Sequence, residues 1–251
     1  MASEEITIIY LTENRLAETI AKLCRKHLVI AADGKRIISV SQKPINLGDN
    51  ICVGDIGRSW LNIYKQQLVG LKEAKTKYVA IAEHDVLYTK EHFNWMPKDD
   101  ETFWFNDNCW FVEWGGNHPE MDGMYSKWSS NRKALSQLIC NRELLIKSVE
   151  ERLELIEGGL KIMRKLGEPG SFPKDVVEAA KIAVSGKPDY LKNLLDKHLT
   201  QFKSESFNTV NPNLDIRHKT NFTGPRRGKK RRYYLEPWGE FKNIWQQMKT
   251  K

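Results

Sequence analysis

The residues most able to do chemistry stand together at Glu83-His84-Asp85, directly after the apolar run Tyr78 to Ala82. A short run of aliphatic and aromatic residues predicts a buried strand. In open α/β sheets, ligands bind just beyond the carboxyl ends of the strands. Carboxylates at Glu83 and Asp85 can meet one divalent cation there, and oxygen ligands suit Mg²⁺ or Mn²⁺ shared with substrate phosphates. The alternative is that the two acids only end the strand in solvent.

The segment before this strand favours the metal site. Ser59 to Ala74 places apolar side chains at helical spacing, namely Leu61, Tyr64, Leu68, Leu71 and Ala74. Helix, short turn, buried strand and acidic tip form a βαβ arrangement with its site at the switch point of the sheet.

The chain opens on a similar unit. Glu5 to Leu11 predicts a first strand, Thr12 to Arg15 a polar turn, and Leu16 to His27 a helix. Strand, polar turn and helix begin a nucleotide-binding α/β domain. Thr12 or Asn14 also suits a plain N-cap of that helix.

A glycine-containing loop follows the second predicted strand, Arg36 to Gln42. The loop runs from Asn46 to Ser59 and leads directly into a helix, so its backbone can approach an anion at the helix N-terminus. Arg58 can clamp a diphosphate with its guanidinium group. The alternative for Arg58 is a surface salt bridge.

An aromatic-rich segment and a polar loop come next. Glu101 to Trp114 predicts two strands around Asn-Asp-Asn, with rings that are mostly core and otherwise a stacking platform for a sugar or a base. Gly115 to Gly123 predicts a polar loop, in which Asp122 either contacts an acceptor, acts as a base or is simply solvated. From Arg142 to Phe202 the sequence predicts long, charged, amphipathic helices.

Length and composition bound the class of protein. The 251 residues suit one α/β domain with a proper core. No apolar run approaches the roughly 20 residues that span a bilayer, and the first residues do not resemble a signal peptide. The scattered cysteines, which are Cys24, Cys52, Cys109 and Cys140, predict reduced, mostly buried thiols. We therefore expect a cytoplasmic protein without integral membrane contact and without a zinc site.

Positive charge is concentrated near the C-terminus. Arg217 to Arg232 holds eight Lys or Arg and no acid, which equals the net charge of +8, so the rest of the chain is formally neutral. Clustered cations beside aromatic rings suit nucleic acid, and the residues concerned are Arg226, Arg227, Lys229, Lys230, Arg231, Arg232 and Tyr233. A solvated tail, a clamp on a diphosphate and contact with an anionic membrane surface are the alternatives.

The predicted helix, the segment Ala74 to Ala82 and the acid-x-Asp tip resemble the core of nucleotide-sugar glycosyltransferases of the GT-A fold. Glu83 stands at the first Asp of that family's Asp-x-Asp motif, which keeps the charge. The resemblance covers roughly residues 5–115 and 210–240. It implies an α/β fold with a GT-A-like mixed sheet flanked by helices, a helical insertion and a basic C-terminal tail. We expect one compact domain divided at 1–135, 136–205 and 206–251.

The same resemblance implies a donor and a metal site. The donor is expected to be a nucleoside diphosphate sugar, most simply a UDP-sugar, held with Mn²⁺ or Mg²⁺. The implied donor contacts are Thr12, Asn14, Gln42, Arg58, Glu83 and Lys219, the metal ligands Asp85, His218 and Glu83, and the catalytic residues Asp122 and Arg217. An imidazole beside carboxylates favours Mn²⁺, and Arg217 can stabilise a leaving diphosphate. The alternative for His218 is an ordinary surface histidine.

The wider pattern, including Ser39 to Pro44 and His218 to Gly224, is similar to small glycosyltransferase-like proteins of DNA phages. This implies sugar transfer to 5-hydroxymethylpyrimidine in double-stranded DNA, with the base rotated out of the duplex. The alternatives are a glycosyltransferase acting on a surface or lipid-linked glycan, and a nucleic-acid-binding protein on a transferase scaffold without turnover.

Overall fold

The structure is a computed structural model that describes residues 6–113, 124–128, 133–157, 189, 192–193, 196, 202–218, 221 and 231–249. Its elements, in chain order, are β1 (Ile6–Thr12), α1 (Glu18–Ala32), β2 (Ile37–Ser41), β3 (Asp49–Cys52), α2 (Trp60–Glu73), β4 (Tyr78–Glu83), β5 (Val86–Leu87), α3 (Lys90–Asn94), β6 (Thr102–Asn106), β7 (Cys109–Glu113), β8 (Tyr125–Lys127), the 3₁₀ turn η2 (Leu135–Gln137), β9 (Leu138–Asn141), α4 (Arg142–Glu157), β10 (Lys203–Phe207), β11 (Asn213–Arg217), β12 (Arg231–Arg232), β13 (Tyr234–Leu235), β14 (Gly239–Glu240) and α7 (Phe241–Lys249).

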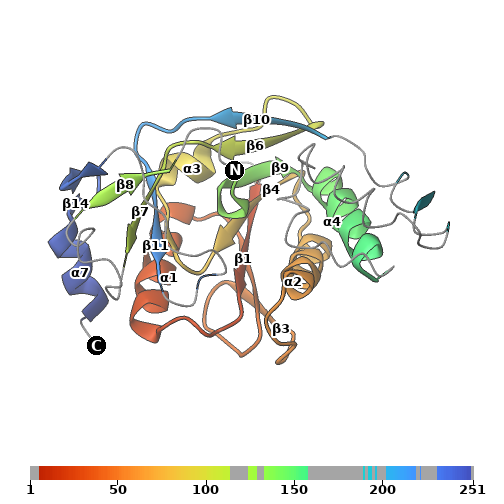
Figure 1. Ribbon diagram of the computed structural model, residues 1–251, viewed down its shortest axis with the longest axis horizontal. Helices are drawn as coiled ribbons and strands as arrows, with labels where there is room; N and C mark the ends of the chain where they lie inside the picture. Colours follow the sequence, from red (N-terminus) through yellow and green to blue (C-terminus); the bar gives the residue numbers. More distant parts are fainter. Residues whose placement is uncertain are drawn as a thin grey trace.

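Half of these strands form one mixed sheet. Seven strands lie in the order β10-β6-β9-β4-β1-β2-β3, and β9 runs antiparallel to both of its neighbours while the other pairs are parallel. A second sheet has the order β12-β8-β7-β11-β5. The expected α/β class, with a mixed sheet flanked by helices, is confirmed (Figure 1).

The central strand β1 is buried along its whole length, because helices cover both faces of the sheet. Side chains alternate between the two faces of a strand. Ile9 packs in a cluster with Leu71 of α2 and Val149 of α4, whereas Ile8 packs with Leu28 of α1 and Phe93 of α3. Helices α2 and α4 therefore cover one face, and α1 and α3 the other (Figure 1).

Helix α1 also joins the two sheets. Its Ile20 packs in a third apolar cluster with Leu214 and Ile216 of β11 and with Phe241 of α7. The indole nitrogen of Trp238 donates to the backbone oxygen of Pro212 at 2.9 Å, which ties the C-terminal hairpin to β11. The late segments of the chain are thus packed onto the first helix.

Helix α2 lies very close to the sheet. A Cβ atom added at Gly70 would lie 2.6 Å from Cγ2 of Ile9 and 3.1 Å from Cγ2 of Val40. Only glycine allows this approach. At the start of the helix, Oγ of Ser59 accepts from the amide of Asn62 at 3.1 Å and caps the first turn.

Several sequence predictions need adjusting at their edges. The predicted loop from Asn46 to Ser59 contains the edge strand β3, and helix α1 continues past His27 to Ala32. The two strands predicted between Glu101 and Trp114 are present, but β6 and β7 enter different sheets because the chain crosses between them at Asp107-Asn108. Three of the four cysteines are buried, as expected, and Cys52 is exposed.

The region expected to be a helical insertion also contributes strands to the main sheet. β9 lies between β4 and β6, and β10 forms the edge beside β6. The domain divisions at residues 135 and 205 stay a prediction. Among the described helices, none combines the length and the apolar character that crossing a bilayer requires.

Candidate metal centre

Strand pairing brings the two predicted ligands together from distant parts of the chain. β4 ends at Glu83, and the turn at His84-Asp85 leads into β5, which pairs antiparallel with β11. The amide of Ile216 donates to the backbone oxygen of Asp85 at 2.7 Å. His218, which directly follows β11, therefore lies beside Asp85 although 133 residues separate them.

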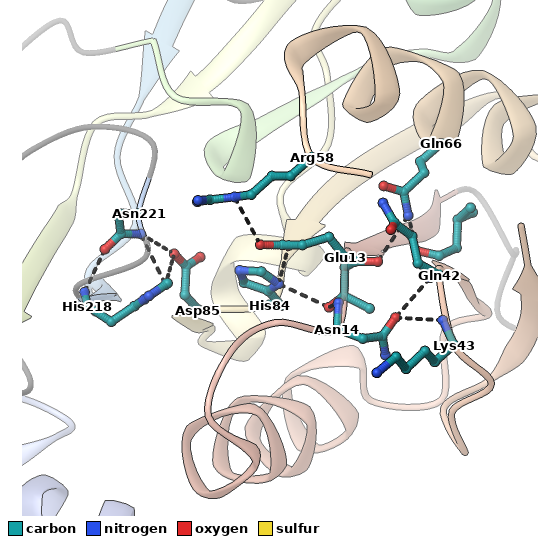
Figure 2. Close-up of polar contacts among 12 residues, drawn as sticks. Glu13, Asn14, Gln42, Lys43, Arg58, Gln66, His84, Asp85, His218 and Asn221 are labelled. Carbon is teal, nitrogen blue, oxygen red and sulfur yellow. Dashed lines mark hydrogen bonds and ion pairs between the residues drawn. The ribbon is translucent and has the colours of Figure 1, made fainter. Parts of the chain in front are cut away.

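Three side chains gather at this point. The ligand atoms of His84, Asp85 and His218 all lie within 4.8 Å of one another. Nε2 of His218 is 3.3 Å from Oδ2 of Asp85, and the same oxygen accepts from the amide of Asn221 at 2.8 Å (Figure 2). Two imidazoles and one carboxylate in this arrangement suit a divalent transition metal.

The Asp85 carboxylate is held in its ionised form. Burial raises its pKa, but the hydrogen bond with His218 and the positive charges of His84, His218 and Arg217 outweigh burial. Together they hold the pKa of Asp85 well below its usual range. A carboxylate ligand must be ionised and a histidine ligand must be neutral, so Asp85 is in the form that binds a metal.

The third member of the group is His84 and not the predicted Glu83. Strand β4 stops at Glu83, so the alternation that would have placed Glu83 and Asp85 on one side does not continue through the turn. The amide of Glu83 donates to the hydroxyl of Tyr88 at 3.0 Å, and its side chain lines the adjoining pocket. A metal contact from Glu83 stays a prediction.

The pocket beside the metal group has a cationic side. The N-terminus of α2 contributes Ser59, Trp60 and Asn62 to its lining, and Arg58 lies directly before them. Nε of Arg58 is 3.4 Å from Oε1 of Glu13. A helix N-terminus with an adjacent guanidinium suits a phosphate group. Arg58 pairs with an acid and also lines the pocket, and its contact with a diphosphate stays a prediction.

Glu13 connects this cation to the metal group. Its other oxygen, Oε2, lies 3.1 Å from Nδ1 of His84, and Oγ1 of Thr12 lies 3.0 Å from the same nitrogen (Figure 2). A continuous line of polar contacts thus runs through the lining of the pocket, from Arg58 through Glu13 to His84.

Asn14 has a backbone role. It adopts a left-handed conformation with φ of 59°, and its Oδ1 accepts from the amides of Gln42 at 2.8 Å and Lys43 at 2.9 Å. It ties the end of β1 to the end of β2 and is not among the residues that line the pocket, so its expected contact with the donor stays a prediction. Gln42 does line the pocket, and its Nε2 donates to the oxygen of Gly57 at 2.6 Å.

Arg217 also lines the pocket and is buried. Its Nη1 is 3.8 Å from Oδ2 of Asp215, and its guanidinium lies 5.5 Å from the ring centre of Trp128. Both Asp215 and Arg217 line the pocket. The guanidinium of Arg217 and the carboxylate of Asp215 therefore lie together in the lining of the pocket.

The predicted residues other than Asn14 fall into three groups. The following line the pocket: Thr12, Gln42, Arg58, Glu83, Asp85, Arg217 and His218. The following lie outside the described residues: Asp122, Lys219, Arg226, Arg227, Lys229 and Lys230. Arg231, Arg232 and Tyr233 are exposed at the far edge of the second sheet, where the Arg232 guanidinium lies 5.3 Å from the ring centre of Trp110.

Sequence reasoning did not assign roles to Glu13, His84, Asp215 or Asn221, all of which line the pocket. Glu13 directly follows the first strand, where ligands of α/β sheets collect, and His84 lies inside the acidic motif. These two positions carried a usable signal. Asn221 carried none, because its contact with Asp85 depends on the path of the chain after β11.

No protein-family model and no curated protein matches this sequence. Solved structures match loosely. Bifunctional IspDF from Campylobacter jejuni is 16% identical, with 60% of this chain and 44% of that chain covered and a TM-score of 0.38. A glycosyltransferase involved in the glycosylation of the major capsid of PBCV-1 is 9% identical, with 84% and 91% covered and a TM-score of 0.43.

A mutant Drosophila β1,4-galactosyltransferase 7 in complex with manganese, UDP-Gal and xylobiose is 12% identical, with 57% and 52% covered and a TM-score of 0.37. The chain spans about half the length of two of these three proteins, 44% and 52%. All three TM-scores are below 0.5, so the proposed activity is based on the geometry of the site.

Proposed function

We propose that this chain is a metal-dependent glycosyltransferase that moves a sugar from a nucleoside diphosphate sugar to a hydroxyl group. The proposal depends above all on one observation. His84 and Asp85, at the end of a central strand, meet His218 from the far end of the chain, beside a pocket with a helix N-terminus and two arginines. That combination suits a metal ion shared with a diphosphate.

The ligand set favours Mn²⁺ over Mg²⁺. Two imidazole nitrogens and one ionised carboxylate oxygen suit a borderline transition metal, whereas Mg²⁺ prefers oxygen ligands alone. When bound, the ion supplies charge that stabilises the departing diphosphate. The same donors suit Fe²⁺ and Zn²⁺, so a metal survey belongs in the first experiment.

The protein's own residues account for the remaining charge. Arg58, the N-terminus of α2 and Arg217 all line the pocket. Their positive charges suit a diphosphate, which the arginines would bind and orient. A UDP-sugar is the simplest donor, in keeping with the resemblance of the acidic motif to GT-A enzymes.

For the acceptor we propose 5-hydroxymethylpyrimidine in double-stranded DNA. Arg231, Arg232, Tyr233 and Tyr234 form an exposed run at the edge of the second sheet. That edge lies three strands from β11, or about 14 Å at the usual strand spacing. A duplex held there could present a rotated base to the pocket.

The donor is tested by a thermal-shift screen of nucleotide sugars, with and without Mn²⁺, Mg²⁺, Fe²⁺ or Zn²⁺. We expect one nucleotide sugar to stabilise the protein only when Mn²⁺ is present. Asp85→Asn should abolish this shift and reduce turnover by about 100-fold or more, since it removes a charged ligand. Asp33→Asn is the matched control, because Asp33 is an exposed carboxylate paired with Lys90. Equal responses of the two variants would refute the metal site.

The acceptor is tested separately with the donor found in that screen. Hydroxymethylated duplex DNA, unmodified duplex DNA and lipid-linked glycan are incubated with radiolabelled donor. Label on hydroxymethylated DNA alone supports the proposal. Label on glycan supports the alternative acceptor, and DNA binding without any transfer supports a binding protein without turnover.

A further inference from the structure

We infer that Glu13 is the positioning residue of the metal centre. Its carboxylate holds the His84 ring with the Nδ1 hydrogen turned away from the metal, so that Nε2 is free to bind the ion. The inference rests on the proposed metal-dependent function, and it assigns a role to a residue outside the ligand set.

The contact itself is short and sheltered. Oε2 of Glu13 lies 3.1 Å from Nδ1 of His84, and the two side chains are only 14% and 11% exposed. An ionised carboxylate can only accept hydrogen bonds. Nδ1 must therefore carry the hydrogen, and the lone pair of the neutral ring must lie on Nε2. Figure 2 shows the ring extending from Glu13 toward Asp85, which places the second nitrogen on the side of the ligand group.

Thr12 steadies the same nitrogen but cannot replace the carboxylate. Its Oγ1 lies 3.0 Å from Nδ1 and also accepts from the amide of Asn14 at 3.0 Å. A hydroxyl group can donate as well as accept, so it does not select one tautomer. A carboxylate behind a metal-binding histidine selects the tautomer and makes the ligand nitrogen more basic.

The second oxygen of Glu13 explains why glutamine cannot replace this residue. Oε1 lies 3.4 Å from Nε of Arg58, so one carboxylate faces a donor on each side. Glutamine has one accepting oxygen and one donating nitrogen. If its oxygen faces Arg58, its NH₂ group faces Nδ1 of His84 and forces the wrong tautomer. If it is turned round, its NH₂ group faces the guanidinium.

The test measures metal binding directly, on the full-length protein without nucleotide sugar. Mn²⁺ affinity is determined by electron paramagnetic resonance for the wild type, Glu13→Gln, Glu13→Asp and the control Glu18→Gln. Glu18 is an exposed acid one turn further along the chain that pairs with Arg25. We expect Glu13→Gln to weaken Mn²⁺ binding by about 10- to 100-fold. Glu13→Asp should recover part of the loss, and Glu18→Gln should match the wild type.

A second readout separates positioning from mere support of the fold. Long-range ¹H–¹⁵N spectra of the metal-free protein report which ring nitrogen of His84 carries the hydrogen. We expect Nδ1–H in the wild type and a shift toward Nε2–H in Glu13→Gln. Mn²⁺ binding within twofold of the wild type, or an unchanged tautomer, would overturn the inference. If the wild type binds no Mn²⁺, the proposed metal site fails, and the tautomer alone decides whether Glu13 orients His84.

Discussion

His92 should make the folded protein sensitive to mild acid. It is fully buried in α3, and its ring stacks on Phe207 with a centroid distance of 6.0 Å. Nδ1 lies 3.3 Å from Nδ2 of Asn106, while Nε2 has no hydrogen-bond partner among the described residues. Burial lowers the pKa of His92 from 6.5 to about 3, since nothing nearby compensates a positive charge.

The sign of the effect follows from which state takes up the proton. Below pH 6.5 the unfolded chain protonates His92, whereas the folded protein does so only near pH 3. Neutral His92 therefore contributes its full stability above pH 6.5, and this contribution is lost progressively as the pH falls to about 3. Within that window, each fall of one pH unit lowers the free energy of unfolding by about 1.4 kcal/mol. The loss between pH 6.5 and pH 5 is therefore about 2 kcal/mol.

Urea denaturation at pH 7 and pH 5 measures this loss. The variant His92→Phe keeps an aromatic ring but cannot titrate, and Asn106 keeps its bond to Oγ1 of Thr209 at 3.0 Å. We expect the wild type to lose about 2 kcal/mol more than the variant between the two pH values. His92→Leu, a smaller replacement, should behave like His92→Phe. Parallel losses in all three proteins would refute the reasoning.

Two further predictions concern the fold and the acceptor. Gly70→Ala should destabilise the protein by about 1–2 kcal/mol in urea denaturation, because the contact with Ile9 at 2.6 Å outweighs the roughly 1 kcal/mol gain in helix propensity. Neutralising Arg231 and Arg232 with glutamine should reduce the salt dependence of duplex DNA binding, lowering the slope of log K against log salt by about 1.8. Lys72→Gln, on α2, should leave this slope unchanged.

Each of these has an outcome that contradicts it. A Gly70→Ala protein as stable as the wild type would mean that α2 can move away from the sheet at no cost. An unchanged salt slope after loss of Arg231 and Arg232 would remove the edge of the second sheet from the proposed DNA surface.

The position of the pocket could be predicted from the sequence because ligands of α/β sheets bind beyond the carboxyl ends of the strands. Thr12, Gln42 and Glu83 end β1, β2 and β4 or directly follow them, and all three line the pocket. The strand boundaries themselves followed from apolar runs. Arg58 was placed by its position before a helix, which is also a local feature.

What the sequence could not reveal depends on contacts between distant segments. The alternation of side chains placed Glu83 with Asp85, but the strand stops at Glu83, and the turn brings in His84 instead. The sequence did not indicate that the side-chain oxygen of Asn14 accepts from two backbone amides at the end of β2. The importance of Glu13 depends on partners 45 and 71 residues further along the chain, Arg58 and His84.

The position of β11 in the second sheet determines when that sheet can form during synthesis of the chain. This late strand inserts between β5 and β7, both made more than a hundred residues earlier. Until β11 is made, the nascent chain therefore exposes the unpaired edges of β5 and β7. Such edges can pair with the wrong strand or be bound by a chaperone. His218 arrives with the same strand, so His84, Asp85 and His218 could hold a metal ion together only after β11 has paired. Retention of the ion would then report that the C-terminal part of the chain has docked.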